Sequence, residues 1–527
     1  MKKFQTILKI FLAAVLLVVS QPSCTKLEEK VYSDLTADKL FSDPDNLIYA
    51  FGVGYTSLYA LVGHKYGMVG MECGTDELIV PQRGGDWLDG GEWHRFHRHT
   101  WTPDDNYLNH WWQNIFGNGI TNCNKLIYQF ENQEGEVDFT PAISELRALR
   151  ALYYYWLIDI FGNVPIVDRI DGPTKPATNS RQEVYDFIEK ELIESMPHLS
   201  KETGLPVYGR INYYTAQMIL AKLYLNAEVY TGTAQWDKAL DVCDTIIGSG
   251  KYSLSGDFFS NFVADASGSQ EVIMGVPFDQ IFSPQFEIHL FTLHYSLPEK
   301  FGIVSASWNG ICFQESFFNL FEEGDTRRNG LLFGPQFFAN GDPVIDPSWE
   351  RFNPQNPTYK DPDGENLNLT PYVNMLEPYC LRQCGARVAK FPFIEGSDRY
   401  ISNDFPIFRY ADVLLMKAEA LLRLGRGTEA LPLVNEVRAR AGVESLTEVT
   451  IQNLIEERGR ELYAEGHRRS DLIRFSTGDM ALSPDNPMNY FAARWEKPDV
   501  SPSHVSLWPV PQRQIDVNEN LEQNDGY

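Results

Sequence analysis

The feature that most restricts the fold of this chain is a pair of helical hairpins, each with apolar residues three and four positions apart. The first spans about residues 213–247 and turns at 231–233, while the second spans about residues 411–437 and turns at 424–427. Apolar side chains at this spacing line one face of a helix, so each helix must bury that face against another element. The pattern therefore predicts a mostly α protein.

Small residues at the helix crossings and a glycine in each turn make both hairpins tetratricopeptide-like. A further helix should carry Leu149, Tyr153 and Trp156 on one face and end at Phe161-Gly162-Asn163. Helical-hairpin units need neighbours to bury their outer faces. We therefore expect the C-terminal hairpin to pack on the N-terminal part of the chain.

The hairpins are separated by a long segment of a different kind, at 251–405, which is rich in Phe, Pro, Gly and Asn and has little periodicity. A shorter irregular segment lies at 64–105. Long irregular segments on a regular scaffold are where binding functions are usually found. We thus predict an N-terminal scaffold at 24–250 with a binding loop at 64–105, a loop-rich ligand-binding insertion at 251–405, and a C-terminal scaffold at 406–527.

The N-terminus has the anatomy of an export signal. A positive start, Met1-Lys2-Lys3, precedes an apolar run from Ile10 to Val19 that ends near Ser23-Cys24. The run is shorter than the ~20 residues that span a bilayer. We predict a lipoprotein signal peptide at 1–23 and lipid on Cys24; a plain secretory signal with an incidental cysteine is the alternative.

The overall charge narrows the possible partners. The formal net charge is -26, which argues against a nucleic-acid partner, because phosphates require a basic surface. Beyond the N-terminal run, no stretch of the sequence is long and apolar enough to cross a membrane, so the lipid is the only membrane element that we predict. Six further cysteines are scattered and do not form a dense disulfide pattern; Cys243, on an apolar helical face, should be a buried thiol.

Four sequence blocks, taken in order, resemble the SusD/RagB family of nutrient-binding outer-membrane lipoproteins. They are Arg147–Leu157 with its exit turn to Pro165, Phe408–Ala420, Glu457–Leu472 and Pro509–Tyr527. The resemblance implies a lipid-anchored protein on the exterior of the outer membrane that caps a SusC-like TonB-dependent barrel. It also implies that the cap binds an oligosaccharide, or in some members a peptide, and delivers it without catalysing a reaction.

The first group of candidate ligand-binding residues lies in the loop from Asp76 to Trp101. It comprises Arg83, Asp86, Trp87 and Trp93. An aromatic platform and charged groups that bond hydroxyls are what sugar binding requires, and the resemblance implies an arginine and an aromatic residue from this part of the chain. Instead of contacting a ligand, Trp93 and Trp101 could anchor the loop in the core, and this is the interpretation that we favour for Trp101.

The second group lies in the insertion and comprises Tyr295, Trp308, Asn309 and Trp349, with Phe313 as a weaker candidate. The resemblance implies that further aromatic residues from this part face the ligand. The alternative is burial, because aromatic residues are more often found in cores and interfaces.

Metal sites are the less favoured interpretation of two other clusters. His94, His97 and His99 alternate with Arg95 and Arg98, which favours a solvated or partner-facing patch over a metal site. The acidic turn at 361–365 is too short for an EF-hand loop. Cys380 and Cys384 could in principle bind a metal ion, but no second pair of ligands stands near them in the sequence. We therefore predict no cofactor, with a structural calcium ion as the alternative.

Enzyme signatures are missing from the sequence. There is no Gly-x-Ser-x-Gly, His-Glu-x-x-His or Gly-x-x-x-x-Gly-Lys motif, and we interpret Glu457, Arg458, Glu461 and Arg468 as a partly buried charge network of the scaffold. The predicted function is glycan binding and delivery to the barrel. The alternatives are a peptide- or other nutrient-binding lid, a helical-repeat adaptor that binds protein, and a surface glycoside hydrolase.

Overall fold

A computed structural model describes residues 47–133, 137–346, 365–482 and 501–527. Contacts within the chain group Tyr49–Tyr527 into one unit. The predicted signal peptide at 1–23, Cys24, Trp349 and residues 361–364 of the acidic turn lie outside the described ranges. None of the described helices has both the length and the apolar character that crossing a membrane demands.

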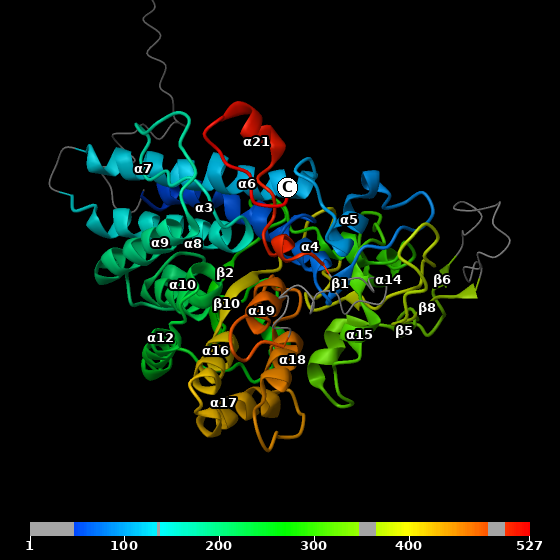
Figure 1. Cartoon of the computed structure of the whole chain (residues 1–527). Helices are drawn as coiled ribbons and strands as arrows, with labels where there is room; N and C mark the ends of the chain where they lie inside the picture. The colour runs from blue at the N-terminus through cyan, green and yellow to red at the C-terminus, as the bar shows by residue number, and fades with distance from the viewer. Residues whose placement is uncertain (1–46, 134–136, 347–364, 483–500) are drawn as a thin grey trace, which may run out of the picture. The chain divides into compact units, whose positions relative to one another are not determined.

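Antiparallel helix pairs form the scaffold (Figure 1), and the fold is mostly α, as predicted. Its helices are α3 (Leu47–Gly63), α6 (Asn106–Trp112), α7 (Thr121–Glu131), α8 (Thr140–Ile160), α9 (Arg181–Ser195), α10 (Tyr213–Leu225), α11 (Ala227–Thr231), α12 (Trp236–Gly248), α16 (Tyr410–Arg423), α17 (Gly427–Arg440), α18 (Ile451–Leu462), α19 (Arg468–Phe475) and α21 (Gln512–Val517). Helix α8 packs on α9, α10 on α12, and α16 on α17. Helix α16 also packs on α12 and α10, so the two hairpins bury their apolar faces against each other.

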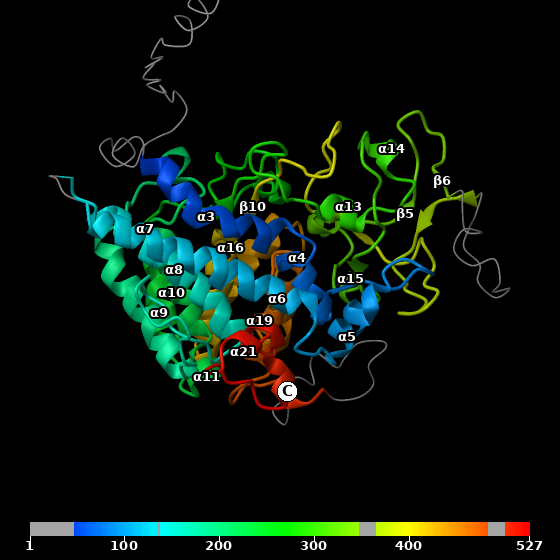
Figure 2. The ribbon, with the colours of Figure 1, turned by 90° about the horizontal axis from the view of Figure 1, so that it is seen from above.

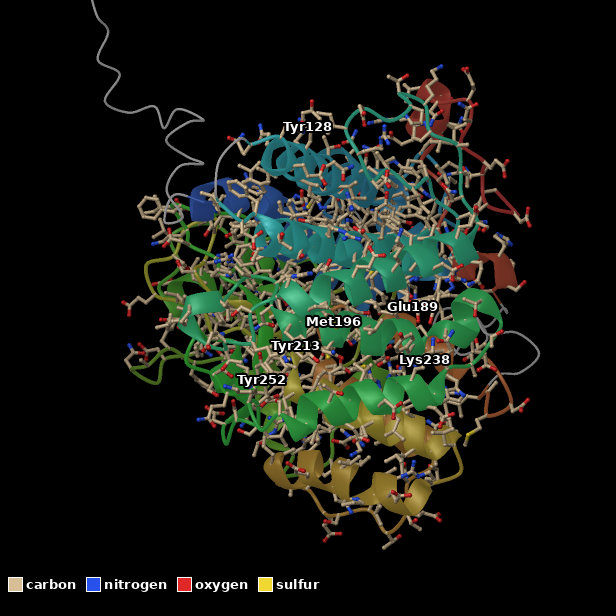
Figure 3. All side chains as sticks on the ribbon, turned by 90° about the vertical axis from the view of Figure 1, so that its left-hand side faces the viewer. Tyr128, Glu189, Met196, Tyr213, Lys238 and Tyr252 are labelled. Atoms are coloured by element: carbon tan, nitrogen blue, oxygen red, sulfur yellow. The ribbon has the colours of Figure 1, made fainter. Side chains whose placement is uncertain are left out.

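Helix boundaries follow local sequence signals. Helix α8 ends at Ile160, where Gly162 adopts φ 73°, and this confirms the predicted stop. Helix α9 begins with a capping box between Ser180 and Glu183. On the outer face of the scaffold, Glu189 of α9 accepts a hydrogen bond from Lys238 of α12 at 3.0 Å (Figure 3).

The core of the C-terminal helices contains a network of buried charges, as the sequence predicted. Arg409 has 1 % of its surface exposed and contacts Glu461 at 2.9 Å and Glu465 at 2.6 Å. Arg458 pairs with Asp471 at 2.8 Å, and Arg468 with Asp76 at 2.8 Å. Despite burial, the neighbouring guanidinium groups lower the pKa of Glu461 and Asp471. Such pairs fix geometry more than they add stability.

Short elements build the insertion beside this scaffold (Figure 2). They include α13 (Ile288–Thr292), α14 (Pro298–Phe301), α15 (Glu315–Phe318) and the antiparallel pairs β4 (Leu331–Leu332) with β9 (Arg387–Val388), β5 (Gly334–Pro335) with β8 (Asn368–Leu369), and β6 (Ile345–Asp346) with β7 (Glu365–Asn366). Strand β2 (Val272–Val276) of the insertion pairs antiparallel with β10 (Phe405–Arg409), which leads into α16. The insertion has its own apolar core around Leu290, Leu293 and Leu297. It is therefore irregular but well packed.

One short sheet joins the insertion to the N-terminal loop. Strand β1 (Leu78–Ile79) pairs with β3 (Cys312–Phe313), with Ile79 opposite Cys312. Helices α4 (Met68–Met71) and α5 (Glu92–Arg98) flank the loop on either side. This pairing brings the two predicted groups of ligand-binding residues together.

Candidate ligand-binding site

Trp87 is the centre of the surface that the two segments form. Its indole Nε1 donates to the Trp308 carbonyl at 2.8 Å, and its ring centroid lies 5.1 Å from that of Phe291. A Cβ atom on Gly310 would lie 2.5 Å from the Trp87 ring, so only glycine permits this approach. The ring is half-buried, and its orientation is fixed by residues more than 200 positions away.

Left-handed backbone conformations cluster around this tryptophan. Trp87 has φ 64°, Asp89 φ 35° and Asn309 φ 50°. Non-glycine residues in this region cost roughly 1–3 kcal/mol each and tend to gather at functional sites. The surrounding contacts must therefore hold the loop in place.

Asp86 and Tyr295 are joined across the two segments. The Tyr295 hydroxyl donates to the Asp86 carboxylate, and both side chains are half-buried. Burial and this carboxylate raise the pKa of Tyr295, so its hydroxyl stays protonated. The pair joins the residue that precedes Trp87 in the chain to the insertion.

Arg83, Trp93 and Asn309 lie beneath the surface, with at most 1 % of each exposed. Arg83 donates to the carbonyls of Asn309 at 2.6 Å and Gly310 at 2.9 Å, while Trp93 donates to Asp89 at 3.1 Å. In this conformation these three side chains support the loop, as the core-anchor interpretation of Trp93 expects. Their contact with a ligand stays a prediction, as does that of Trp349.

Lys65 and Tyr66 belong to this surface, although the sequence reasoning did not single them out. The Lys65 ammonium lies 5.0 Å from the Tyr66 ring centroid and 5.5 Å from that of Trp87, and it is 3.9 Å from Asp89. The signal that could have found them is Gly63-His64-Lys65-Tyr66-Gly67, in which a cation and an aromatic residue stand between two glycines. We call Lys65, Tyr66, Asp86, Trp87, Tyr295 and Trp308 the Trp87 patch.

The prediction of a solvated or partner-facing histidine patch was wrong. His94, His97 and His99 are each at most 3 % exposed, because the segment folds as helix α5 and packs inward. His94 lies 2.8 Å from Glu377, and His99 contacts Ser501 at 2.9 Å. Within the part of the chain that the structure describes, no group of three His, Cys, Asp or Glu side chains is arranged to hold a metal ion.

Two other predictions concern buried residues and are confirmed. Trp101 is 5 % exposed and packs on Phe96 and Trp508, which makes it a core anchor. Cys243 is fully buried. Cys380 is fully buried as well, and Cys384 has 2 % of its surface exposed. The last two belong to an apolar cluster with Val373 and Leu376.

The Trp87 patch combines chemically complementary groups. A half-buried aromatic face can stack on an apolar ring face, while the carboxylate, phenol and ammonium groups around it can bond hydroxyls. Most of a small-molecule site of this kind is apolar, with a few placed polar groups. The fold and the patch together define a protein with a helical scaffold and a loop-built surface for ligand binding.

Comparisons with known proteins agree with this class. A model of the SusD family matches residues 383–527, and a model described as starch-binding associating with outer membrane matches residues 71–225. The starch-binding protein SusD of Bacteroides thetaiotaomicron is 26 % identical over 459 residues, which cover 81 % of this chain and 80 % of that protein. The chain belongs to the SusD/RagB family.

Solved structures show the same fold. Surface glycan-binding protein A from Bacteroides uniformis superimposes with a TM-score of 0.72 at 20 % identity, covering 92 % of this chain and 99 % of that one. The same-named protein from Bacteroides thetaiotaomicron, solved in complex with laminarihexaose, gives 0.68 at 22 % identity and covers 91 % and 99 %. At these identities the likeness is one of fold.

Proposed function

We propose that this protein is a surface glycan-binding lipoprotein that hands oligosaccharides to a SusC-like TonB-dependent transporter in the outer membrane. The observation that carries the proposal is the Trp87 patch, whose half-buried aromatic ring is held by a hydrogen bond to the Trp308 carbonyl and by packing on Phe291, with the Lys65 ammonium 5.5 Å from the ring centroid. The starch- and laminarihexaose-binding relatives support a sugar as the ligand.

Within this proposal the predicted residues divide into two roles. Asp86, Trp87, Tyr295 and Trp308 would contact the sugar, with Lys65 and Tyr66 beside them. Arg83, Trp93 and Asn309 would hold the loops from beneath, since all three are buried. The protein would need no cofactor for binding, and it would catalyse no reaction on the glycan.

The anchoring part of the proposal rests on the sequence of the N-terminus. Lipid on Cys24 would tether the chain to the outer membrane, because acyl chains contribute ~0.8 kcal/mol for each buried methylene. The partner barrel is proposed from the family alone. The alternative functions to be tested against the proposed glycan binding are those of a peptide-binding lid and of a protein-binding adaptor.

The test is titration of the mature chain with maltohexaose, laminarihexaose and soluble starch, read by tryptophan fluorescence and calorimetry. We expect the Trp87→Ala variant to lose at least tenfold in affinity for the sugar that binds. Trp236→Ala is the matched control, because Trp236 is also half-buried but packs under Arg423 on the scaffold.

Three results would contradict the proposal. They are no response of the wild-type chain to any glycan, equal binding by the Trp87→Ala variant, and release of reducing ends from starch or laminarin by the purified protein. The first would favour the peptide or adaptor alternative, and the last the hydrolase.

A further inference from the structure

A groove of about 820 Å³ lies away from the Trp87 patch. Its walls are the helical segment Gln113–Ile120, the loop that follows α8, and the C-terminal segment around α21. Figures 1 and 2 both show α21 beside α6, and none of the residues that line the groove belongs to the Trp87 patch. The volume is within the ~300–1,000 Å³ range of small-molecule sites.

The first wall is an unusual helix. Gln113–Ile120 forms a π-helix, and its widened turn is closed by the Thr121 hydroxyl, which donates to the Phe116 carbonyl at 2.7 Å. π-Helical turns are rare and frequently line functional sites. Here the turn carries Phe116, which is half-buried against Trp112, with 4.7 Å between the ring centroids. The wall thus presents an aromatic ring in a fixed position.

The opposite wall is tied together by side-chain amides. Asn518 donates to the Pro176 carbonyl at 2.9 Å, and Asn520 donates to the Lys175 carbonyl at 2.9 Å. Val517, at the end of α21, is 66 % exposed and borders the groove. Because both walls are held by internal bonds, a ligand would lose little affinity to ordering them.

The chemistry of the lining favours a neutral ligand with flat apolar faces and many hydroxyls. Phe116, Pro173 and Val517 supply apolar surface, while Gln113 and Asn118 supply exposed amides. Among the described residues that line the groove, Lys175 is the one ionisable side chain, and it already pairs with Glu519 at 2.9 Å. An anion would find no other countercharge in the lining, and an acyl chain would desolvate the amides without bonding them.

We propose that this groove is a second glycan subsite, which takes a segment of a neutral hexose chain. This inference rests on the proposed function, because it assumes that the ligand is a glycan. A polysaccharide that reaches both sites would bind more tightly than a short oligosaccharide, because the second contact becomes intramolecular. The Trp87 patch would then select the sugar, and the groove would retain a long chain.

The test compares three variants of the mature chain. Val517→Arg fills the groove from an exposed position, so it should leave the fold intact. Gln113→Ala combined with Asn118→Ala removes two exposed amides from the same groove. Val53→Arg is the matched control, because Val53 is 47 % exposed on α3. Thermal melting checks that each variant is folded.

We expect the wild-type chain to bind two molecules of the preferred hexasaccharide, and both groove variants to bind one. We also expect both groove variants to lose at least tenfold in affinity for soluble starch or laminarin, whichever binds, while Val53→Arg does not. One hexasaccharide per wild-type chain, with unchanged polysaccharide affinity in both groove variants, would overturn the subsite and leave the Trp87 proposal standing. No glycan binding by the wild-type chain would instead overturn both proposals.

Discussion

Gly310 offers the sharpest test of how the Trp87 patch is built. The Cβ atom of an alanine at this position would lie 2.5 Å from the Trp87 ring and 2.7 Å from the Phe291 ring. Both rings are packed, so one of them must move. Overpacking of this kind costs about 1–3 kcal/mol. We expect Gly310→Ala to lower the free energy of unfolding by that amount and to weaken glycan binding, because the displaced ring is the proposed platform.

The matched control lies in the same loop as Trp87. A Cβ atom on Gly85 would meet no atom within 4 Å, and its φ does not lie in the left-handed region that disfavours alanine. Gly85→Ala should therefore change stability by less than about 0.5 kcal/mol, as surface substitutions usually do. Urea unfolding followed by circular dichroism measures both variants.

A double-mutant cycle isolates the contact between Gly310 and Trp87. Once Trp87→Ala has removed the indole, the extra methyl at position 310 has space on that side, and only the clash with Phe291 remains. We expect the two changes to couple by about 0.5–2 kcal/mol, within the range for residues in contact. Strictly additive effects, or a Gly310→Ala variant as stable as Gly85→Ala, would refute the packing argument.

Two further predictions concern acid stability and anchoring. Burial lowers the pKa of five histidines to about 4, so each contributes stability that is present above pH 6.5 and is lost as the pH falls toward 4. These are His64, His110, His289, His294 and His467. Burial acts oppositely on four carboxyl groups, because it raises the pKa of Asp404 to about 6, that of Glu72 to about 8 and those of Glu77 and Glu287 above their usual values. The five histidines outnumber these carboxyl groups. We therefore expect the urea midpoint to fall between pH 6.5 and 4.5, and a flat or rising midpoint would contradict this balance. For anchoring, Cys24→Ser should release the chain from the membrane fraction and abolish labelling by radioactive palmitate, whereas Cys243→Ser should do neither; labelling that persists in Cys24→Ser would disprove the anchor.

The sequence alone was sufficient to predict the scaffold. The helical hairpins, the end of α8 near Gly162 and the burial of Cys243 follow from apolar spacing and turn residues, which act over a few positions. The charge network at Glu457, Arg458 and Glu461 was predictable for the same reason, since the charges alternate with apolar residues on one helix. The family resemblance likewise followed from residues that stand in four short, continuous blocks of the sequence.

The site required the tertiary structure. Trp87 and Trp93 stand six positions apart in a segment that the sequence predicts to be irregular, and nothing local distinguishes the half-buried ring from the buried one. The difference is made by Phe291, Trp308 and Gly310, which reach the loop only because β1 pairs with β3. In an irregular segment, side-chain direction is not set by a repeating backbone angle, so contacts from distant parts of the chain decide which groups face a ligand. The same long-range packing turned the histidines of α5 inward and brought the C-terminal segment against the π-helix to form the groove.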